Sequence, residues 1–328
     1  MEISRIAEDD EAGIEAWFQL RLAWSREMPG DPGPCRTFHG AILTLPWPDE
    51  EDRAYLATVD GVPVGYCSAT LHLADNRDVL GCELVVHPDH RHRGYGTALL
   101  QRLLAVAAES GCTRLLTEMP IDGPGAHWAR ARGTRPVMEE MHRRLDLTTV
   151  DSAAHDALLA QARAHATGYT VLQWTSPIPD EHLTGCAVLE GKMSTDMPLD
   201  DLAWEPEAYD AERMRRRDAM IAGRGMRQYT SVARHDETGE LVGSTTLTRL
   251  ASLPDHIDQW ETIVLDEHRG HRLGLLLKIE NLRFARREEP QLRYIDTVNA
   301  DSNAPMLRVN LALGFEPVRS WAEWELAL

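Results

Sequence analysis

A basic, glycine-containing stretch near residue 90 combines residue types that could hold an anion. Residues 85–100, V-V-H-P-D-H-R-H-R-G-Y-G-T-A-L-L, begin as a β-type run and continue after a basic turn as an amphipathic helix. Gly94 and Gly96 carry no side chain, so a ligand could approach the backbone there, and Arg91 and Arg93 add positive charge. A strand that enters a helix through such a turn leaves free N–H groups at the positive end of the helix. The stretch therefore predicts a phosphate site, and the alternative is an ordinary β-to-α turn with solvated arginines.

This turn is neither of two well-known nucleotide-binding loops. The P-loop pattern G-x-x-x-x-G-K-[ST] is absent, and G-x-G-x-x-G does not follow the strand. His87, His90 and His92 lie beside a proline and the basic turn, so we expect turn residues or phosphate contacts rather than metal ligands. No metal site is predicted.

The same stretch recurs in the second half of the chain. E-L-V-V-H-P-D-H-R, residues 83–91, matches E-T-I-V-L-D-E-H-R, residues 261–269, without a gap. The two copies are 178 positions apart, and the same distance separates Gly96 from Gly274. This period is too long for a solenoid and indicates a duplicated domain. The length of 328 residues also favours two domains of about 150 residues each. We predict that the domains comprise residues 1–150 and 151–328.

Around each copy the sequence predicts the same order of elements. Two strands joined by a tight turn at Asp60-Gly61 precede a third strand near residues 81–86, and a helix, a strand and a short helix follow up to Gly133. In the second half the corresponding series ends at Gly314, where glycine stops a helix. Each half is therefore predicted to have an α/β or α+β fold, with a mixed, mostly antiparallel central sheet flanked by helices.

Charge and composition exclude several classes of function. The formal net charge of −18 disfavours general binding to nucleic acid or to an anionic membrane surface. The five cysteines form no CxxC pair, which argues against disulfides and fits a cytoplasmic protein. No signal peptide or membrane span is expected, because the start is acidic and the apolar runs are short. The basic run at residues 213–217 is expected on a solvated helix face or at the seam between the domains.

Arg91-x-x-Gly94-x-Gly96, preceded by a strand, resembles the acyl-CoA signature R/Q-x-x-G-x-G/A of the GNAT superfamily of N-acyltransferases. The resemblance implies two tandem GNAT-like domains, with acetyl-CoA as co-substrate and the coenzyme diphosphate held by the turn. It also implies that the preceding strand separates from its neighbour at a bulge and pairs with the pantetheine arm. The residues that it assigns to coenzyme binding in the first domain are Leu84, Val85, Val86, Arg91, His92, Arg93, Gly94, Tyr95, Gly96 and Thr97.

The second copy departs from this pattern. Arg272 replaces the first glycine, and its Cβ would restrict the backbone, so coenzyme binding is expected mainly in the first domain. Further along, the second copy is closer to the family, and Asn303 is assigned to coenzyme binding there. Many family members have a tyrosine that protonates the departing thiolate. The matching positions here hold Ala129 and Asn310.

Acyl transfer to an amine also requires a base, because an alkylammonium with a pKa of about 10 must lose a proton before its nitrogen can attack. Glu83 and Glu261 occupy equivalent positions in the strand before each turn, where family members often place a catalytic glutamate. The alternative is that each faces solvent or an arginine. A cysteine nucleophile is not expected, because neither Cys82 nor Cys112 is spaced to pair with a histidine.

These observations predict an acyl-CoA-dependent N-acyltransferase that moves an acetyl group to a primary amine of a small molecule by direct attack in a ternary complex. One alternative places catalysis in the second domain, with Glu261 as the base. Another is a catalytically silent acyl-CoA-binding module with a regulatory role. The protein is expected to be a monomer or a homodimer, without nucleic-acid or membrane partners.

Overall fold

The computed structural model describes residues 1–196 and 198–328, and the chain forms two compact units. The first unit comprises Met1–Glu140, Asp200–Ala203 and Arg319–Leu328, and the second comprises Met141–Leu199 and Trp204–Val318. This division differs from the expected boundary at residue 150. The first unit ends earlier in the chain and also contains the C-terminal segment from Arg319, which no local sequence signal assigns to it.

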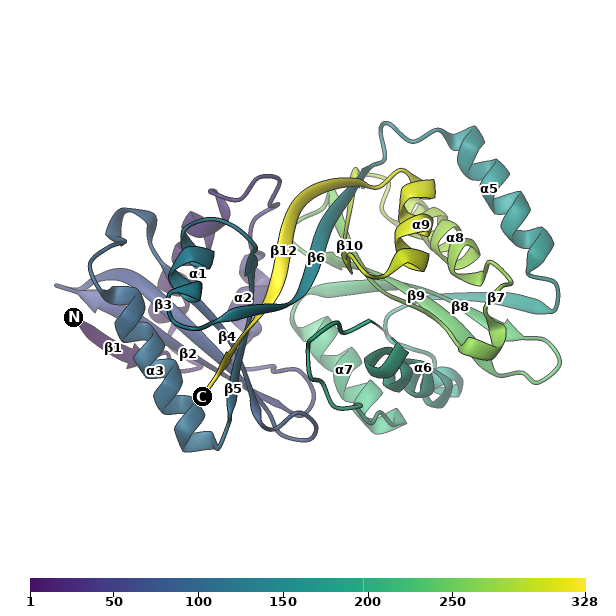
Figure 1. The fold of residues 1–328 in the computed structure, drawn as a ribbon. Coiled ribbons are helices and arrows are strands. Elements are labelled where there is room, and N and C mark those ends of the chain that lie inside the picture. The colour runs from purple at the N-terminus through teal and green to yellow at the C-terminus, as the bar shows by residue number, and fades with distance from the viewer. Residues whose placement is uncertain (197) are drawn as a thin grey trace. The chain divides into compact units, whose positions relative to one another are not determined.

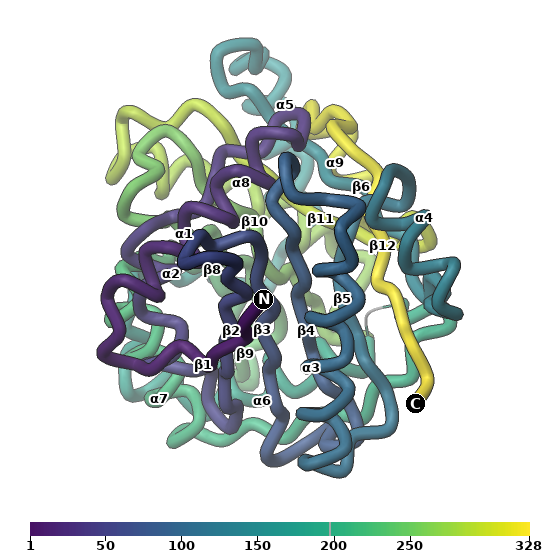
Figure 2. The backbone as a smooth tube through the Cα atoms, turned by 90° about the vertical axis from the view of Figure 1, so that its left-hand side faces the viewer, coloured from purple at the N-terminus to yellow at the C-terminus, as the bar shows by residue number. Residues whose placement is uncertain are grey.

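The first unit is built on a six-stranded sheet with the order β1-β2-β3-β4-β5-β12, in which only β4 and β5 pair in parallel. Figure 2 shows β12, drawn in yellow, beside β5. The elements are β1 (Glu2–Arg5), α1 (Glu11–Ser25), α2 (Arg36–Ala41), β2 (Glu50–Val59), β3 (Val62–His72), β4 (Val79–Val86), α3 (Tyr95–Ser110), β5 (Arg114–Pro120), α4 (Pro124–Arg130), the first part of β6 (Arg135–Asp146) and most of β12 (Glu316–Ala327).

Alternating side chains place helices on both faces of this sheet. Leu56 and Tyr66 pack with α1 in one apolar cluster, whereas their neighbours Ala57 and Cys67 pack with α3 in another. Successive side chains of a strand point to opposite faces, so α1 and α3 cover opposite faces. The predicted tight turn at Asp60-Gly61 is present, with both residues in the left-handed conformation that a two-residue hairpin favours.

The second unit repeats this architecture. Its sheet has the order β6-β11-β10-β9-β8-β7, with β10 and β11 parallel, and helices α5 and α8 pack on one face and α6 and α7 on the other (Figure 1). The elements are α5 (Ser152–His165), β7 (Tyr169–Thr175), α6 (Leu183–Asp196), α7 (Ala211–Gly223), β8 (Met226–His235), β9 (Leu241–Leu250), β10 (His256–Val264), α8 (Leu273–Glu288), β11 (Tyr294–Ala300) and α9 (Ala304–Leu313). The predicted fold class is confirmed for both copies.

Two further features bear on the expectations above. All five cysteines are free thiols, and four of them are buried. In the described part of the chain, no helix is long and apolar enough to cross a bilayer.

Candidate functional site

Strands β4 and β5 of the first unit separate along their length. They pair only where residues 79–81 lie beside residues 114–116, although β4 continues to Val86 and β5 to Pro120. On its other side β4 stays paired with β3 as far as Val86. The β5-facing backbone groups of residues 84–86 are therefore not used by the sheet, and an extended ligand could pair with them.

The predicted turn lies where β4 leads into α3. His92 (φ 62°) and Gly94 (φ 86°) are both left-handed, and the N–H groups of Thr97 and Ala98 bond back to the carbonyl of Gly94 at 3.1 and 3.2 Å. Among the described residues, the N–H groups of residues 93–96 have no acceptor. A side chain at Gly94 would meet nothing within 4 Å. The structure thus brings residues 92–97 together as an open end of a helix with free donors.

Gly96 has a different surrounding from Gly94. A Cβ at Gly96 would lie 3.5 Å from Cζ2 of Trp128, on α4. A Cβ there would thus be in ordinary van der Waals contact with the indole ring, which packs against α3 at this position. Gly94 is the position at which a ligand has free access to the turn.

The arginines of the motif are held in the turn. Arg91 Nη2 lies 2.5 Å from Glu27 Oε2, and Arg91 Nε donates to the carbonyl of Val86 at 3.4 Å. Arg93 Nη2 donates to the carbonyl of Asp89 at 3.3 Å. Arg91 therefore ties the turn to the end of β4 and to Glu27, a partner that no sequence pattern indicated.

The histidines of the turn also make local contacts. His87 Nδ1 accepts a hydrogen bond from the N–H of Asp89 at 3.2 Å, and its ring packs edge-on against His90 at 5.5 Å. Within residues 1–196 and 198–328, no group of three or more His, Cys, Asp or Glu side chains is arranged to hold a metal ion.

Arg132 reaches the turn from beyond the end of α4, and sequence reasoning missed it. Its Nη2 donates to Thr97 Oγ1 at 3.0 Å, and its Nη1 donates to the carbonyl of Trp128 at 3.0 Å. The guanidinium also lies over the Trp128 ring at 4.0 Å. The local signal that points to it is the pair of arginines in residues 129–134, A-R-A-R-G-T.

The carboxylate of Glu83 is held by one side chain at each of its two oxygens. Its Oε2 accepts a hydrogen bond from the hydroxyl of Tyr66 at 2.6 Å, and its Oε1 forms an ion pair with Arg21 of α1. Tyr66 is fully buried, and this burial raises the pKa of its hydroxyl. The phenol therefore stays protonated and donates to the carboxylate.

The first unit also holds a group of close acidic side chains on β5, β12 and β6. Glu323 lies directly opposite Glu118 in the antiparallel ladder. Burial, together with the neighbouring carboxyl groups of Glu118 and Glu140, raises the pKa of Glu323 to about 9. Burial and Glu118 likewise raise the pKa of Glu140 to about 7. Like charges that face each other across strands are unfavourable, so the group retains protons at neutral pH.

The second unit has a strand separation and, in addition, a bulge. Strand β10 pairs with β11 only over residues 256–259, and its register with β9 shifts between Gln259 and Thr262. The bulge contains Trp260 and Glu261, whereas the β3–β4 ladder of the first unit has no register shift. The bulge implied by the family resemblance is therefore present in the second copy. A bulge frees backbone groups from the ladder, which is one way to present N–H donors to a carbonyl oxygen.

The turn of the second unit keeps the backbone shape of the first. Gly270 (φ 86°) and Arg272 (φ 55°) are left-handed, at the positions that correspond to His92 and Gly94. Each copy thus has one glycine at one of two left-handed positions. A left-handed arginine costs about 1 kcal/mol, and Arg272 Nη1 donates to Gln161 of α5 at 3.1 Å.

Glu261 also faces an arginine. Its Oε1 lies 3.7 Å from Arg217 Nη2, and Arg217 Nη1 donates to Glu190 of α6 at 2.7 Å. Arg217 is only 5% exposed and Arg213 is also buried, so the expectation that the run 213–217 lies on a solvated face is wrong for these two residues. Burial raises the pKa of Glu190. Both strand glutamates therefore match the arginine-facing alternative, and this pairing alone does not assign their catalytic role.

The asparagines of the second copy belong to the framework of the unit. Asn303 caps α9, because its Oδ1 accepts from the N–H of Met306 at 3.2 Å. Asn310, at the position of the family's tyrosine, is fully buried, accepts from Lys278 Nζ at 2.8 Å and donates to Asn299 at 2.5 Å. Burial lowers the pKa of Lys278 to about 7. This network joins α8, α9 and β11 through Asn310, the sequence position at which the resemblance implies a tyrosine.

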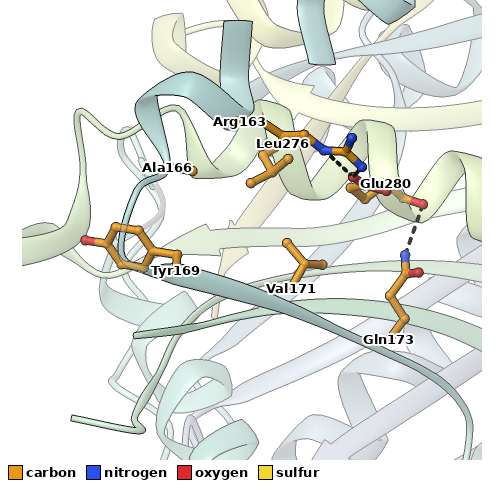
Figure 3. A pocket seen from close by; sticks show the side chains of 7 residues that line it. All are labelled: Arg163, Ala166, Tyr169, Val171, Gln173, Leu276 and Glu280. Carbon is orange, nitrogen blue, oxygen red and sulfur yellow. Dashed lines mark hydrogen bonds and ion pairs between the residues drawn. The ribbon is translucent and has the colours of Figure 1, made fainter. Parts of the chain in front are cut away.

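A pocket of about 390 Å³ lies between α5, β7 and α8 (Figure 3). Arg163 Nε bonds to Glu280 at 3.1 Å, and Gln173 donates to the carbonyl of Glu280 at 3.0 Å. Tyr169 lies at the opposite end of the pocket from Gln173. None of the predicted site residues lines it; the lining residues are Arg163, Ala166, Tyr169, Val171, Gln173, Leu276 and Glu280.

Known proteins resemble this chain over one or both units. Residues 16–133 match the acetyltransferase (GNAT) family model. A mycothiol acetyltransferase from Stackebrandtia nassauensis is 27% identical over 282 residues, which cover 81% of this chain and 80% of that protein. An L-2,4-diaminobutyric acid acetyltransferase from Nocardia farcinica is 31% identical over 139 residues, or 41% of this chain and 61% of that protein.

Solved structures extend the likeness to the full chain. A tandem GNAT protein from the clavulanic acid biosynthesis pathway has a TM-score of 0.83 and 29% identity, and covers 99% of this chain and 98% of its own. A GCN5-related N-acetyltransferase from Sphaerobacter thermophilus shares the fold, with a TM-score of 0.67 and 16% identity, over 99% of this chain and 95% of its own. Residues 16–133 therefore match the GNAT acetyltransferase family, and the chain as a whole has the fold of a tandem GNAT protein, which supports an N-acetyltransferase.

Proposed function

We propose that the protein transfers an acetyl group from acetyl-CoA to a primary amine of a small molecule, with the coenzyme bound in the first unit. One observation carries this proposal. The open turn at Gly94, with free N–H groups at residues 93–96, follows directly on a strand whose residues 84–86 lack a neighbour on the β5 side. A diphosphate fits the first feature and an extended pantetheine arm fits the second.

The chemistry needs no covalent enzyme intermediate. The amine loses a proton to a base, its nitrogen attacks the thioester carbonyl carbon, and the C–S bond breaks to release coenzyme A as a thiolate that takes up a proton. Glu83 is the proposed base in this unit, acting directly or through water. Tyr66 and Arg21 hold its carboxylate in place.

The class of acceptor rests on the relatives. The two curated relatives described above are named for small-molecule substrates, and the net charge of −18 suits a cationic amine. We propose no metal, nucleic-acid or membrane partner, a cytoplasmic location in keeping with five free thiols, and a monomer or homodimer.

Replacement of Gly94 tests the coenzyme site. In Gly94→Asp, a carboxylate at the positive end of α3 would occupy the free N–H groups and repel the diphosphate. We expect the Kd for acetyl-CoA, measured by isothermal titration calorimetry, to rise by about 100-fold. Aspartate tolerates the left-handed conformation, so the variant should fold.

Two variants control this experiment. Gly94→Asn has the same shape without the charge and should weaken binding by about 10-fold or less. Gly111 is also left-handed (φ 74°) and open, but lies at the other end of α3, so Gly111→Asp should leave the affinity within about 2-fold. Equal binding by Gly94→Asp and Gly111→Asp would refute the assignment of the turn.

Replacement of the strand glutamates tests the base. If Glu83 accepts the proton, Glu83→Gln should lower kcat by about 100-fold or more with little change in acetyl-CoA affinity. Release of free coenzyme A thiol is followed with the best acceptor from an amine panel.

A second candidate places catalysis in the second unit, and the bulge at Trp260 and Glu261 favours it. It predicts the same loss for Glu261→Gln and an unchanged rate for Glu83→Gln. If both variants keep wild-type turnover, the assignment of a strand glutamate as base is wrong.

A further inference from the structure

In the described part of the first unit, the arginine of the R-x-x-G-x-G pattern is already ion-paired with a carboxylate. Arg91, the arginine of the motif, is engaged by Glu27 and by the carbonyl of Val86. Arg93 is exposed and keeps its charge, because it donates only to the neutral carbonyl of Asp89. A diphosphate at the open turn carries at least two negative charges, and the helix end supplies only partial positive charge. Another cation near the turn would therefore contribute strongly to its binding.

Arg132 is placed to be that cation. Its Nη2 bonds to the hydroxyl of Thr97, in the first turn of α3, so the guanidinium lies beside the helix end that carries the free N–H groups. A guanidinium has five N–H donors. Two of these are used by Thr97 and the Trp128 carbonyl, and the other three have no acceptor in the described part of the chain.

Trp128 fixes the guanidinium in this position. The indole lies under the guanidinium at 4.0 Å, and its Cζ2 is 3.5 Å from where a Cβ of Gly96 would be. The indole thus packs on α3 at the second glycine of the motif and supports Arg132. A side chain held by three contacts before the ligand arrives loses little further freedom on binding.

We propose that Arg132, supported by Trp128, binds the diphosphate of acyl-CoA together with the free N–H groups at the start of α3. The proposal rests on the proposed function of the first unit. Arg132 is a positioning and binding residue in this scheme, because it lies at the diphosphate end of the coenzyme rather than at the thioester.

The test compares two arginines of the same chain segment. Arg130 Nη2 donates to the carbonyl of Ile121 at 2.9 Å and its guanidinium lies over Trp324, so Arg130→Gln is the matched control for Arg132→Gln. Isothermal titration calorimetry on the full chain measures the Kd for acetyl-CoA at several salt concentrations. Inorganic pyrophosphate serves as a competitor that carries only the diphosphate chemistry.

We expect Arg132→Gln to raise the Kd for acetyl-CoA by about 10- to 100-fold, as for other charge-assisted hydrogen bonds. The salt dependence of binding should become shallower, and pyrophosphate should compete less well. Arg132→Lys should restore part of the affinity. Trp128→Leu should cost about 2- to 5-fold through the lost stacking, and Arg130→Gln should bind like the wild type.

Three outcomes would overturn the inference. These are wild-type affinity in Arg132→Gln, equal losses in Arg132→Gln and Arg130→Gln, or a loss in Arg132→Gln with an unchanged salt dependence, which would indicate a purely structural role. Failure of the proposed function looks different, because the wild-type chain itself would then bind no acetyl-CoA.

Discussion

Removal of residues 319–328 is expected to unfold the first unit and to abolish its binding of acetyl-CoA, while the second unit keeps its core. Residues 321–327 of β12 pair with residues 114–120 of β5. They also bring Trp324, which is fully buried, into contact with Ala126 of α4. Loss of one buried tryptophan side chain costs about 3–5 kcal/mol. Loss of the whole strand exceeds that and approaches the entire stability of an ordinary domain, about 5–15 kcal/mol.

Hydrogen exchange followed by mass spectrometry measures this difference unit by unit. In the shortened chain, amides of β4, β5 and α4 should lose protection, while those of β9 and α8 should retain it. Trp324→Ala in the full-length chain is a milder change. It should lower the free energy of unfolding of the first unit alone, by about 3–5 kcal/mol. Protection of β5 that survives the deletion would show that β12 contributes little to the first unit.

The stability of the first unit is expected to fall as the pH rises, because of the acidic group formed by Glu118, Glu140 and Glu323. The pKa of Glu323 is raised from its ordinary 4.5 to about 9, and that of Glu140 to about 7. At a pH between the ordinary pKa and the raised pKa values, the folded unit holds protons that the unfolded chain has released. The contribution of these protons to stability is therefore complete when the pH is below the ordinary pKa. It is lost as the pH rises through the raised pKa values.

In urea unfolding of the wild type, the free energy of unfolding of the first unit should be lower at about pH 8 than at about pH 5, by about 1–3 kcal/mol. The groups in electrostatic contact with Glu323 are Glu118, Glu140 and the thiol of Cys82, and none of them supplies a positive charge. Glu323→Gln should remove most of the pH dependence and raise the stability at pH 8. Glu109→Gln, on the exposed end of α3, serves as a control that leaves the slope unchanged. A wild-type stability that is flat over this range would contradict the proposed protonation.

Much of the fold could be predicted because local patterns encode it. The Asp60-Gly61 turn, the apolar face of α3 and the glycine at the end of α9 each depend on residues close together in the chain. The repeat then doubled this information. Gly94 and Gly270 are left-handed, a conformation that glycine adopts without steric cost, although His92 and Arg272 adopt it as well.

The partners of the site residues could not be predicted in the same way. Arg91 with Glu27, Glu83 with Arg21, and Thr97 with Arg132 are 64, 62 and 35 positions apart, and nothing in the local pattern links them. The prediction of a solvated position for Arg217 was wrong for a related reason. Its run of basic residues resembles a solvated helix face, but Glu190 and Glu261 come from other elements and allow the charge to be buried.

The strand supplied by β12 also has a consequence for how the protein is made. Strand β5 of the first unit can pair with β12 only after Ala327 has left the ribosome, when the whole second unit has been synthesised. A nascent chain stopped at residue 150 thus carries the whole turn around Gly94 but only part of the sheet that supports it. If the first unit binds the coenzyme as proposed, that binding is a property of the completed chain, and a chain released early should not capture acetyl-CoA.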